Sequence, residues 1–129
     1  MTLLLVLDSG AVTRLAERSA RAAALIAALR AGGLWPPIVP SMVLVECLAG
    51  DGSRDAKEHR FLRTCDVTEA VPAGLARRAA GLRTAARQGS AVDALLIAVA
   101  EPGGTVLTGD PGDLRALAAH ASDVTIEPI

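Results

Sequence analysis

Four acidic residues occupy positions at which a carboxylate needs an explanation. Asp8 follows the aliphatic run LLLVL and Asp110 follows TVLTG, so each one ends a predicted strand. Glu46 lies in PSMVLVECLAG and Asp93 in SAVDALLIAVA, two predicted helices with almost no other polar side chain. A carboxylate inside an apolar helix is costly to bury unless it is paired, hydrogen-bonded or bound to a metal ion. Because no Arg or Lys lies within a helical turn of Glu46 or Asp93, we expect the partner to be a distant residue or an ion.

Each of these acids also has a purely structural explanation. Aspartate is common where strands break, so Asp8 could be a turn residue. The segment DPGD, which begins at Asp110, places an N-cap acid, a proline and a second acid, Asp113, in the spacing of a helix start. Asp93 lies three residues after a serine, which is the spacing of a capping box. Glu46 comes after the first turn of its helix and has the weakest structural explanation.

We expect the four acids to meet at one edge of a parallel sheet, because functional clefts in such sheets lie outside the carboxyl ends of the strands. Two of the acids end strands, and the other two lie early in helices that follow strands. Four carboxylates at one edge would repel one another unless a divalent cation neutralised them. Mg²⁺ prefers oxygen ligands and is typically held by one or two carboxylates together with substrate phosphate. The chemistry implied is metal-assisted attack of water on a phosphodiester.

Short aliphatic strands alternate with helices along the 129 residues. This pattern predicts a single α/β domain over 1–129, with a mainly parallel sheet flanked by helices in three layers, α/β/α. A serine, Ser41, is the expected N-cap of the second helix. The predicted strands are 3–7, 38–39, 66–70, 105–108 and 124–127. The predicted helices are 11–31, 42–48, 54–64, 72–87, 91–100 and 110–121.

Composition narrows the function further. The net charge is −1, and Lys57 is the only lysine among 13 basic residues, so arginine carries almost all of the positive charge. The only aromatic residues are Trp35 and Phe61, which argues against a base-stacking surface for single strands. The two cysteines and two histidines lack metal-site spacing. No apolar run approaches the ~20 residues of a membrane helix and no signal peptide is recognisable, so we expect a cytoplasmic protein without membrane partners.

The motifs together resemble those of the PIN-domain ribonucleases, and among them the VapC-type toxins of bacterial toxin–antitoxin pairs. The resemblance covers essentially the whole chain and is carried, in order, by LDSGAV, PSMVLVECLAG, SAVDALLIAVA and VLTGDPGDLRAL. It implies a parallel sheet flanked by helices and Mg²⁺- or Mn²⁺-dependent endoribonuclease activity on structured RNA, such as transfer or ribosomal RNA. It also implies homodimerisation and inhibition by a small cognate antitoxin.

The resemblance assigns roles to individual residues. Asp8, Glu46 and Asp93 would form an acidic triad around the metal ion, and Asp110 would be the fourth acid. Asp113 matches a less constant polar position after it, and the capping argument leaves open which of the two is a ligand. Hydroxyl groups that would hydrogen-bond beside the acids are those of Ser9 and Thr108.

The remaining charged residues give weaker indications. Other acids, Asp55 among them, have polar neighbours and are expected to be solvated. The helix 11–31 and the polar helix around Arg60 are expected to form the antitoxin groove. Arginines on two predicted helices are candidate phosphate contacts, although each could simply lie on a solvated helix face; they are Arg14, Arg18 and Arg21, and Arg77, Arg78, Arg83 and Arg87.

Two other functions are considered. In a phosphatase or receiver domain, Asp8 would be a phosphorylated nucleophile. The phosphatase motif requires an acid two residues later, where this chain has Gly10, and both classes require a late lysine, whereas none follows Lys57. The second alternative is a PIN-like module that binds RNA or protein without catalysis. It predicts that Asp93→Asn behaves like the wild type.

Overall fold

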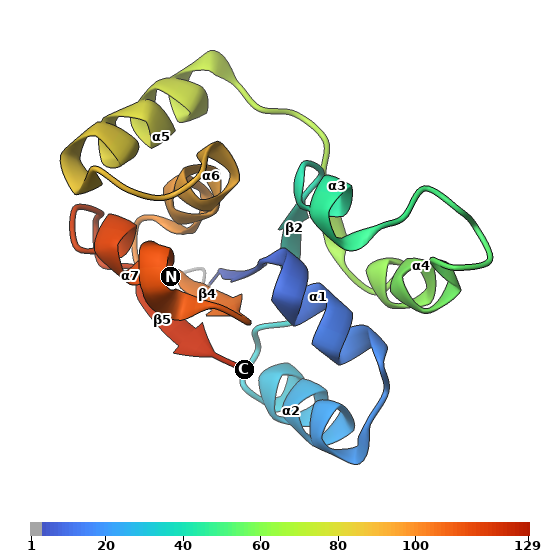
Figure 1. Ribbon diagram of the computed structural model, residues 1–129. Helices are drawn as coiled ribbons and strands as arrows, with labels where there is room; N and C mark the ends of the chain where they lie inside the picture. Colours follow the sequence, from blue (N-terminus) through green and yellow to red (C-terminus); the bar gives the residue numbers. More distant parts are fainter. Residues whose placement is uncertain (1–3) are drawn as a thin grey trace.

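The fold of residues 4–129, described from a computed structural model, is a parallel sheet flanked by helices (Figure 1). Five strands form the sheet in the order β3-β2-β1-β4-β5, and every neighbouring pair is parallel. The predicted α/β class and parallel sheet are therefore confirmed. Of the predicted strand 3–7, residue 3 lies outside the described residues. The strands are β1 (Leu5–Leu7), β2 (Ile38–Pro40), β3 (Asp66–Thr68), β4 (Thr105–Thr108) and β5 (Thr125–Pro128).

The helices pack in two groups, which Figure 1 shows on either side of the strands. In the first group α1 contacts α2, α3 and α4, and in the second α5, α6 and α7 contact one another. This arrangement gives the three layers expected from the sequence. The helices are α1 (Ser9–Ala16), α2 (Ala20–Ala31), α3 (Val43–Cys47), α4 (Ala56–Leu62), α5 (Ala73–Ala86), α6 (Ala91–Ala100) and α7 (Pro111–Ala118).

The central strand β1 is the point at which the order of the strands reverses. The chain adds β2 and β3 on one side of β1, and later β4 and β5 on the other. In the β1–β4 pair Leu7 lies opposite Leu107, so the two strands end side by side at their carboxyl ends. In open parallel sheets, ligand sites lie at such a reversal. Asp8 and Gly109 are the first residues beyond these strands, so the sheet topology brings the segments after β1 and β4 together.

The hydrophobic core holds β1 in place. Leu5, Val6 and Leu7 are all buried, because helices cover both faces of the central strand. The edge strands β3 and β5 have mostly exposed side chains. Asp8 therefore extends from the most buried strand of the sheet, and its backbone is fixed where the strand ends.

The predicted helix 11–31 is wrong, because the structure divides it into α1 and α2. Arg18, between them, adopts a left-handed backbone conformation with φ 60°. The Ser19 hydroxyl then accepts a hydrogen bond of 3.0 Å from the Ala22 backbone N–H and caps α2. A capping serine offers the backbone an alternative to a continuous helix, and the alanine-rich composition concealed this break.

Other local predictions have mixed outcomes. The strand 105–108 and the helix 91–100 have the predicted bounds. Ser41 is not an N-cap: α3 is only five residues long, Met42 precedes it without a side-chain cap, and the Ser41 hydroxyl donates to the Glu69 carbonyl at 3.5 Å. No helix within residues 4–129 is long and apolar enough to cross a membrane.

Candidate functional site

Asp8 is held by hydrogen bonds to both of its carboxylate oxygens. Its Oδ1 accepts from the Ala11 backbone N–H at 2.8 Å and from the Gly109 N–H at 3.3 Å, and its Oδ2 accepts from the Thr108 hydroxyl. Asp8 is thus the N-cap of α1, as well as an acid at the reversal point. The structural and functional explanations of Asp8 therefore do not exclude each other.

Thr108 links the Asp8 carboxylate to the backbone of Asp110, the other acid predicted to end a strand. It is fully buried, donates to Asp8 Oδ2 and accepts from the Asp110 backbone N–H at 2.9 Å. Asp110 precedes α7, but its side chain makes no capping hydrogen bond and is exposed. The capping explanation thus fails for the Asp110 carboxylate, which stays free for a ligand. Ser9, the other hydroxyl singled out in the sequence, is the first residue of α1.

Glu46 lies on α3 and shares an electrostatic environment with two other acids. Partial burial raises the pKa of the Glu46 carboxyl, and the negative charges of Asp93 and Asp8 raise it further. Asp93 and Asp8, which come from two other segments of the chain, are therefore both near enough to Glu46 to repel its carboxylate. The expectation that Glu46 is buried is wrong. Because α3 is short and exposes one side, Glu46 and Val45 both face solvent.

Asp93 forms the capping box predicted from its spacing. Its backbone N–H donates to the Ser90 hydroxyl at 3.0 Å, and its Oδ2 accepts from the Ser90 backbone N–H at 3.2 Å. The carboxylate is half-buried at the start of α6. One oxygen is thus used in the cap, and Oδ1 remains for another partner.

Asp113 is tied to the turn that precedes α6. Its Oδ1 accepts a hydrogen bond of 3.1 Å from the Gln88 side-chain amide, and Gln88 lies two residues before Ser90. Because Asp113 has this partner whereas Asp110 has no side-chain cap, Asp110 is the better candidate for the fourth acid. The Gln88 contact joins residues 25 positions apart, so no local pattern indicates it.

Two glycines allow the segments after β1 and β4 to come into contact. A Cβ on Gly10 would lie 3.0 Å from the Gly109 Cα atom, and a Cβ on Gly109 would lie 3.2 Å from the Gly10 Cα atom. The same Gly10 Cβ would lie 3.6 Å from Asp8 Oδ1. Backbone contact at this point brings the Gly109 N–H within reach of Asp8, so both glycines contribute to the position of the carboxylate.

Asp55 was expected to be solvated, and this expectation is wrong. Its side chain is 3% exposed and accepts hydrogen bonds from three successive backbone N–H groups, those of Ala49 at 2.7 Å, Gly50 at 2.9 Å and Asp51 at 3.2 Å. It thereby fixes the turn that follows α3, the helix that carries Glu46. The signal in the sequence was a run of turn residues, AGDGS, a few positions before the acid.

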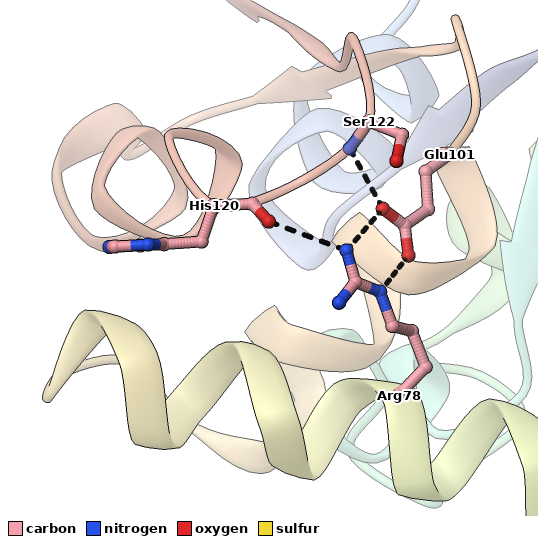
Figure 2. Close-up of polar contacts among 4 residues, drawn as sticks. All are labelled: Arg78, Glu101, His120 and Ser122. Atoms are coloured by element: carbon pink, nitrogen blue, oxygen red, sulfur yellow. Dashed lines mark hydrogen bonds and ion pairs between the residues drawn. The ribbon is translucent and has the colours of Figure 1, made fainter.

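Among the candidate phosphate-binding arginines, Arg78 is already engaged. Figure 2 shows its guanidinium paired with Glu101 at the end of α6; Nη2 lies 3.0 Å from Glu101 Oε2 and 3.3 Å from the His120 carbonyl. The Ser122 backbone N–H donates to the same Glu101 oxygen at 2.9 Å. These contacts hold down the pKa of Glu101 and join α5, α6 and the segment after α7. Arg78 is therefore a structural residue.

The other arginines differ in their surroundings. Arg14 donates to the Ile129 carbonyl, and Arg83 Nε donates to the Gly89 carbonyl at 3.2 Å. Arg87 ends α5 in a left-handed conformation with φ 56°. Arg77 is exposed on α5, and Arg21 is exposed on α2. Of these, Arg83 and Arg87 lie nearest in sequence to the Ser90–Asp93 cap and line a hollow of about 410 Å³ with Gln88 and Gly89.

The donor set of the site suits a hard cation, since it consists of carboxylate and hydroxyl oxygens. Burial is the main cause of the raised Glu46 pKa, and the charges of Asp93 and Asp8 add a smaller repulsion that a divalent cation would offset. Within residues 4–129, however, no group of three or more His, Cys, Asp or Glu side chains is arranged to hold a metal ion. Binding would therefore require a change in side-chain position, and Glu46 and Asp110 are the exposed members of the predicted set. Comparison with protein-family models and with curated proteins finds no match to this chain.

Proposed function

We propose that this protein is a Mg²⁺- or Mn²⁺-dependent endoribonuclease that acts as the toxin of a toxin–antitoxin pair. The proposal rests on the resemblance of the four acidic motifs to PIN-domain ribonucleases. The observation that supports it best is that Asp93 and Asp8, of which Asp8 lies at the reversal point of the sheet, are both close enough to Glu46 for their negative charges to raise its pKa. Transfer or ribosomal RNA as substrate, a homodimer, a small antitoxin partner and a cytoplasmic location belong to the same proposal.

In this proposal different residues of the chain have different roles in metal binding and orientation. Asp8, Glu46 and Asp93 hold the metal ion, and the exposed Asp110 is the fourth acid. A bound divalent cation supplies charge neutralisation and Lewis-acid activation for attack of water on the phosphodiester. The Thr108 hydroxyl and the Gly109 N–H orient Asp8. Preorganised ligands of this kind reduce the reorganisation needed when substrate binds.

The direct test of this function is digestion of RNA. Purified protein free of any antitoxin is incubated with total cellular RNA in Mg²⁺, in Mn²⁺ and in EDTA. We expect discrete cleavage products in either metal and none in EDTA, with new ends mapped by primer extension. RNA that stays intact in both metals would overturn the proposed activity.

Metal binding should also be visible in thermal stability. We expect Mn²⁺ at ~100 times its Kd to stabilise the metal-free protein by about 2.7 kcal/mol and to raise Tm by several degrees.

In EDTA, Glu46→Gln should slightly raise Tm near neutral pH, because it removes a charge that Asp93 and Asp8 repel. The folded state holds the Glu46 proton more tightly than the unfolded state. Wild-type stability should therefore decline as pH rises through the raised pKa, and the variant should lose this component.

Differential scanning fluorimetry checks both statements. Asp66→Asn, which changes an exposed acid at the start of β3, is the matched control and should keep the Mn²⁺ response. A wild-type Tm that does not move in millimolar Mn²⁺ would count against a shared metal site.

A second candidate function is a PIN-like module that binds RNA or protein without cleaving it. It is favoured by the lack, within residues 4–129, of a ready-made group of three metal ligands. Asp93→Asn separates the two functions, because a non-catalytic module should retain full binding and cellular effect in this variant. Asparagine can keep both the backbone and side-chain positions of the Ser90–Asp93 cap.

A further inference from the structure

A basic cavity lies away from the acidic residues, at the other end of α1. Asp8 caps the start of this helix, whereas Arg18 follows its end. The cavity has a volume of about 190 Å³ and is bounded by α1, α2, α4 and the segment around Trp35. Its lining includes four cationic side chains and no carboxylate; the cations are Arg18, Arg30, Lys57 and Arg60.

The four cations are exposed, and none of them lies within 4.0 Å of a carboxylate oxygen of residues 4–129. Within residues 4–129 the only ion pair with an N–O distance of 4.0 Å or less is the one between Arg78 and Glu101, on the α5–α7 side of the molecule. Four positive charges around one small cavity repel one another, and a bound anion would relieve this repulsion. The floor beneath them is apolar, with Leu15 and Phe61 both buried.

A tryptophan in the cavity wall supplies a second, independent observation. The indole Nε1 of Trp35 is buried and has no hydrogen-bond partner within residues 4–129. Buried N–H groups are almost always paired, and this unpaired donor belongs to a residue that lines the cavity. The Arg30 guanidinium lies 5.1 Å from the centre of the Trp35 ring, and Phe61 packs edge-on against that ring at 6.1 Å.

The position of Arg18 is a third observation. Its left-handed backbone is a conformation in which glycine or asparagine is usual and arginine is not. Strained residues of this kind tend to gather at functional sites. Arg30 and Arg60 also lie in the last turns of α2 and α4, where they can stabilise the helix dipoles. That role does not account for Arg18, Lys57 or the unpaired indole N–H.

We propose that this cavity binds a terminal phosphate group, either free in solution, on a mononucleotide, or at the end of an RNA chain. Guanidinium groups bind phosphate oxygens in bidentate fashion. A terminal phosphate is close to a dianion at neutral pH, whereas a backbone phosphodiester carries one charge. The high local positive charge therefore favours the terminal group. The small volume, about 190 Å³ and open to solvent, suits one phosphate and an attached sugar better than a length of backbone.

The single tryptophan makes the test simple. Because Trp35 is the only tryptophan and the chain has no tyrosine, fluorescence excited at the indole absorption band comes from Trp35 and reports on this cavity alone. Inorganic phosphate, adenosine monophosphate and a short oligoribonucleotide with a 5′-phosphate are titrated in EDTA at constant ionic strength. We expect a saturable change in emission and matching heat by calorimetry. The same oligonucleotide with a 5′-hydroxyl should bind about tenfold more weakly or worse, as expected for loss of charge-assisted hydrogen bonds.

Two variants and two controls locate the binding. Arg60→Gln and Lys57→Gln should each weaken phosphate binding by about tenfold. Arg115→Gln, which changes an exposed arginine on α7, should bind like the wild type. Asp8→Asn should also bind phosphate like the wild type. Asp8 lies at the other end of α1 from the cavity, and EDTA removes metal ions from the acidic residues. Loss of RNA cleavage thus leaves the present proposal standing, and loss of phosphate binding leaves the proposed nuclease standing.

The relative affinities of the three ligands distinguish the possible sources of the phosphate group. Equal affinity for free phosphate and the oligonucleotide would identify a small-molecule site, and preference for the oligonucleotide would identify an RNA end. Absence of saturable fluorescence and calorimetric signals with all three ligands up to about 10 mM would overturn the proposal. Wild-type affinity in both Arg60→Gln and Lys57→Gln would also overturn it. Tighter binding of an acidic peptide such as oligoglutamate would overturn the phosphate site and show instead that the cavity receives a protein segment, as expected if residues 11–31 and the helix around Arg60 form the antitoxin groove.

Discussion

Replacing Asp8 with asparagine should reduce metal-dependent RNA cleavage at least about a hundredfold while leaving the fold intact. The carboxylate charge is what a metal ion would require, whereas the cap of α1 needs only an oxygen that accepts from the Ala11 N–H. Asparagine and aspartate are almost equally good N-cap residues. Asp8→Asn therefore removes the charge and keeps the helix start.

A pair of further variants makes this result interpretable. Asp8→Ala removes the charge and the cap together, so it should also lower stability by about 0.5–2 kcal/mol. Asp66→Asn changes an exposed acid at the amino end of β3 and should cleave RNA like the wild type. Cleavage by gel assay, read together with Tm and circular dichroism, separates the two roles of Asp8. Wild-type cleavage by Asp8→Asn would exclude this residue from the chemistry.

The largest loss of stability from a change of an acidic residue should come from Asp55→Ala, with a fall in Tm of roughly 5 °C or more. The substitution leaves three backbone N–H groups, those of Ala49, Gly50 and Asp51, without their acceptor. Asp55→Asn should also be destabilised, because the Nδ2 amide group presents donors where the structure requires an acceptor. Asp66→Asn again serves as the control, and thermal unfolding by circular dichroism is the measurement.

The effect of Asp55 should depend on pH in a defined direction. The hydrogen bond from the Ala49 N–H, together with those from Gly50 and Asp51, lowers the pKa of Asp55 below its ordinary value. A lowered folded-state pKa gives stability that is present above the unfolded pKa of about 3.9 and is lost as pH falls through the folded pKa. The difference in Tm between wild type and Asp55→Ala should therefore be constant near pH 6 and shrink in acid. A difference that grew on acidification would contradict this assignment.

The sequence was informative for the central strands and for the Asp93 cap, where a local pattern decides the structure. The aliphatic runs before Asp8 and Gly109 identified the central strands, because strands covered on both faces need side chains of that kind. The serine three residues before Asp93 identified the capping box, since both partners lie within one helical turn. These features depend on neighbours in the chain and can be read without the fold.

What the sequence did not reveal depends on distant partners or on competition between local preferences. The break at Arg18 follows from the Ser19 cap, which outweighs the helix preference of the surrounding alanines. Glu46 was expected to be buried because its neighbours are apolar, but the short α3 exposes its outer face. The burial of Asp55 depends on the shape of the preceding turn, and the Gln88–Asp113 contact on the packing of α5 near α7.

The sheet order has a consequence for biosynthesis. Asp8 is made early, but the Thr108 hydroxyl that orients it comes 100 residues later. The central strand has three residue pairs with β4, whereas its pairing with β2 is the single pair Val6–Ile38. A chain still emerging from the ribosome therefore lacks the strand that completes its centre, and contacts so distant in sequence form slowly. The surroundings of Asp8 are therefore complete only after β4 has been made and has joined the sheet.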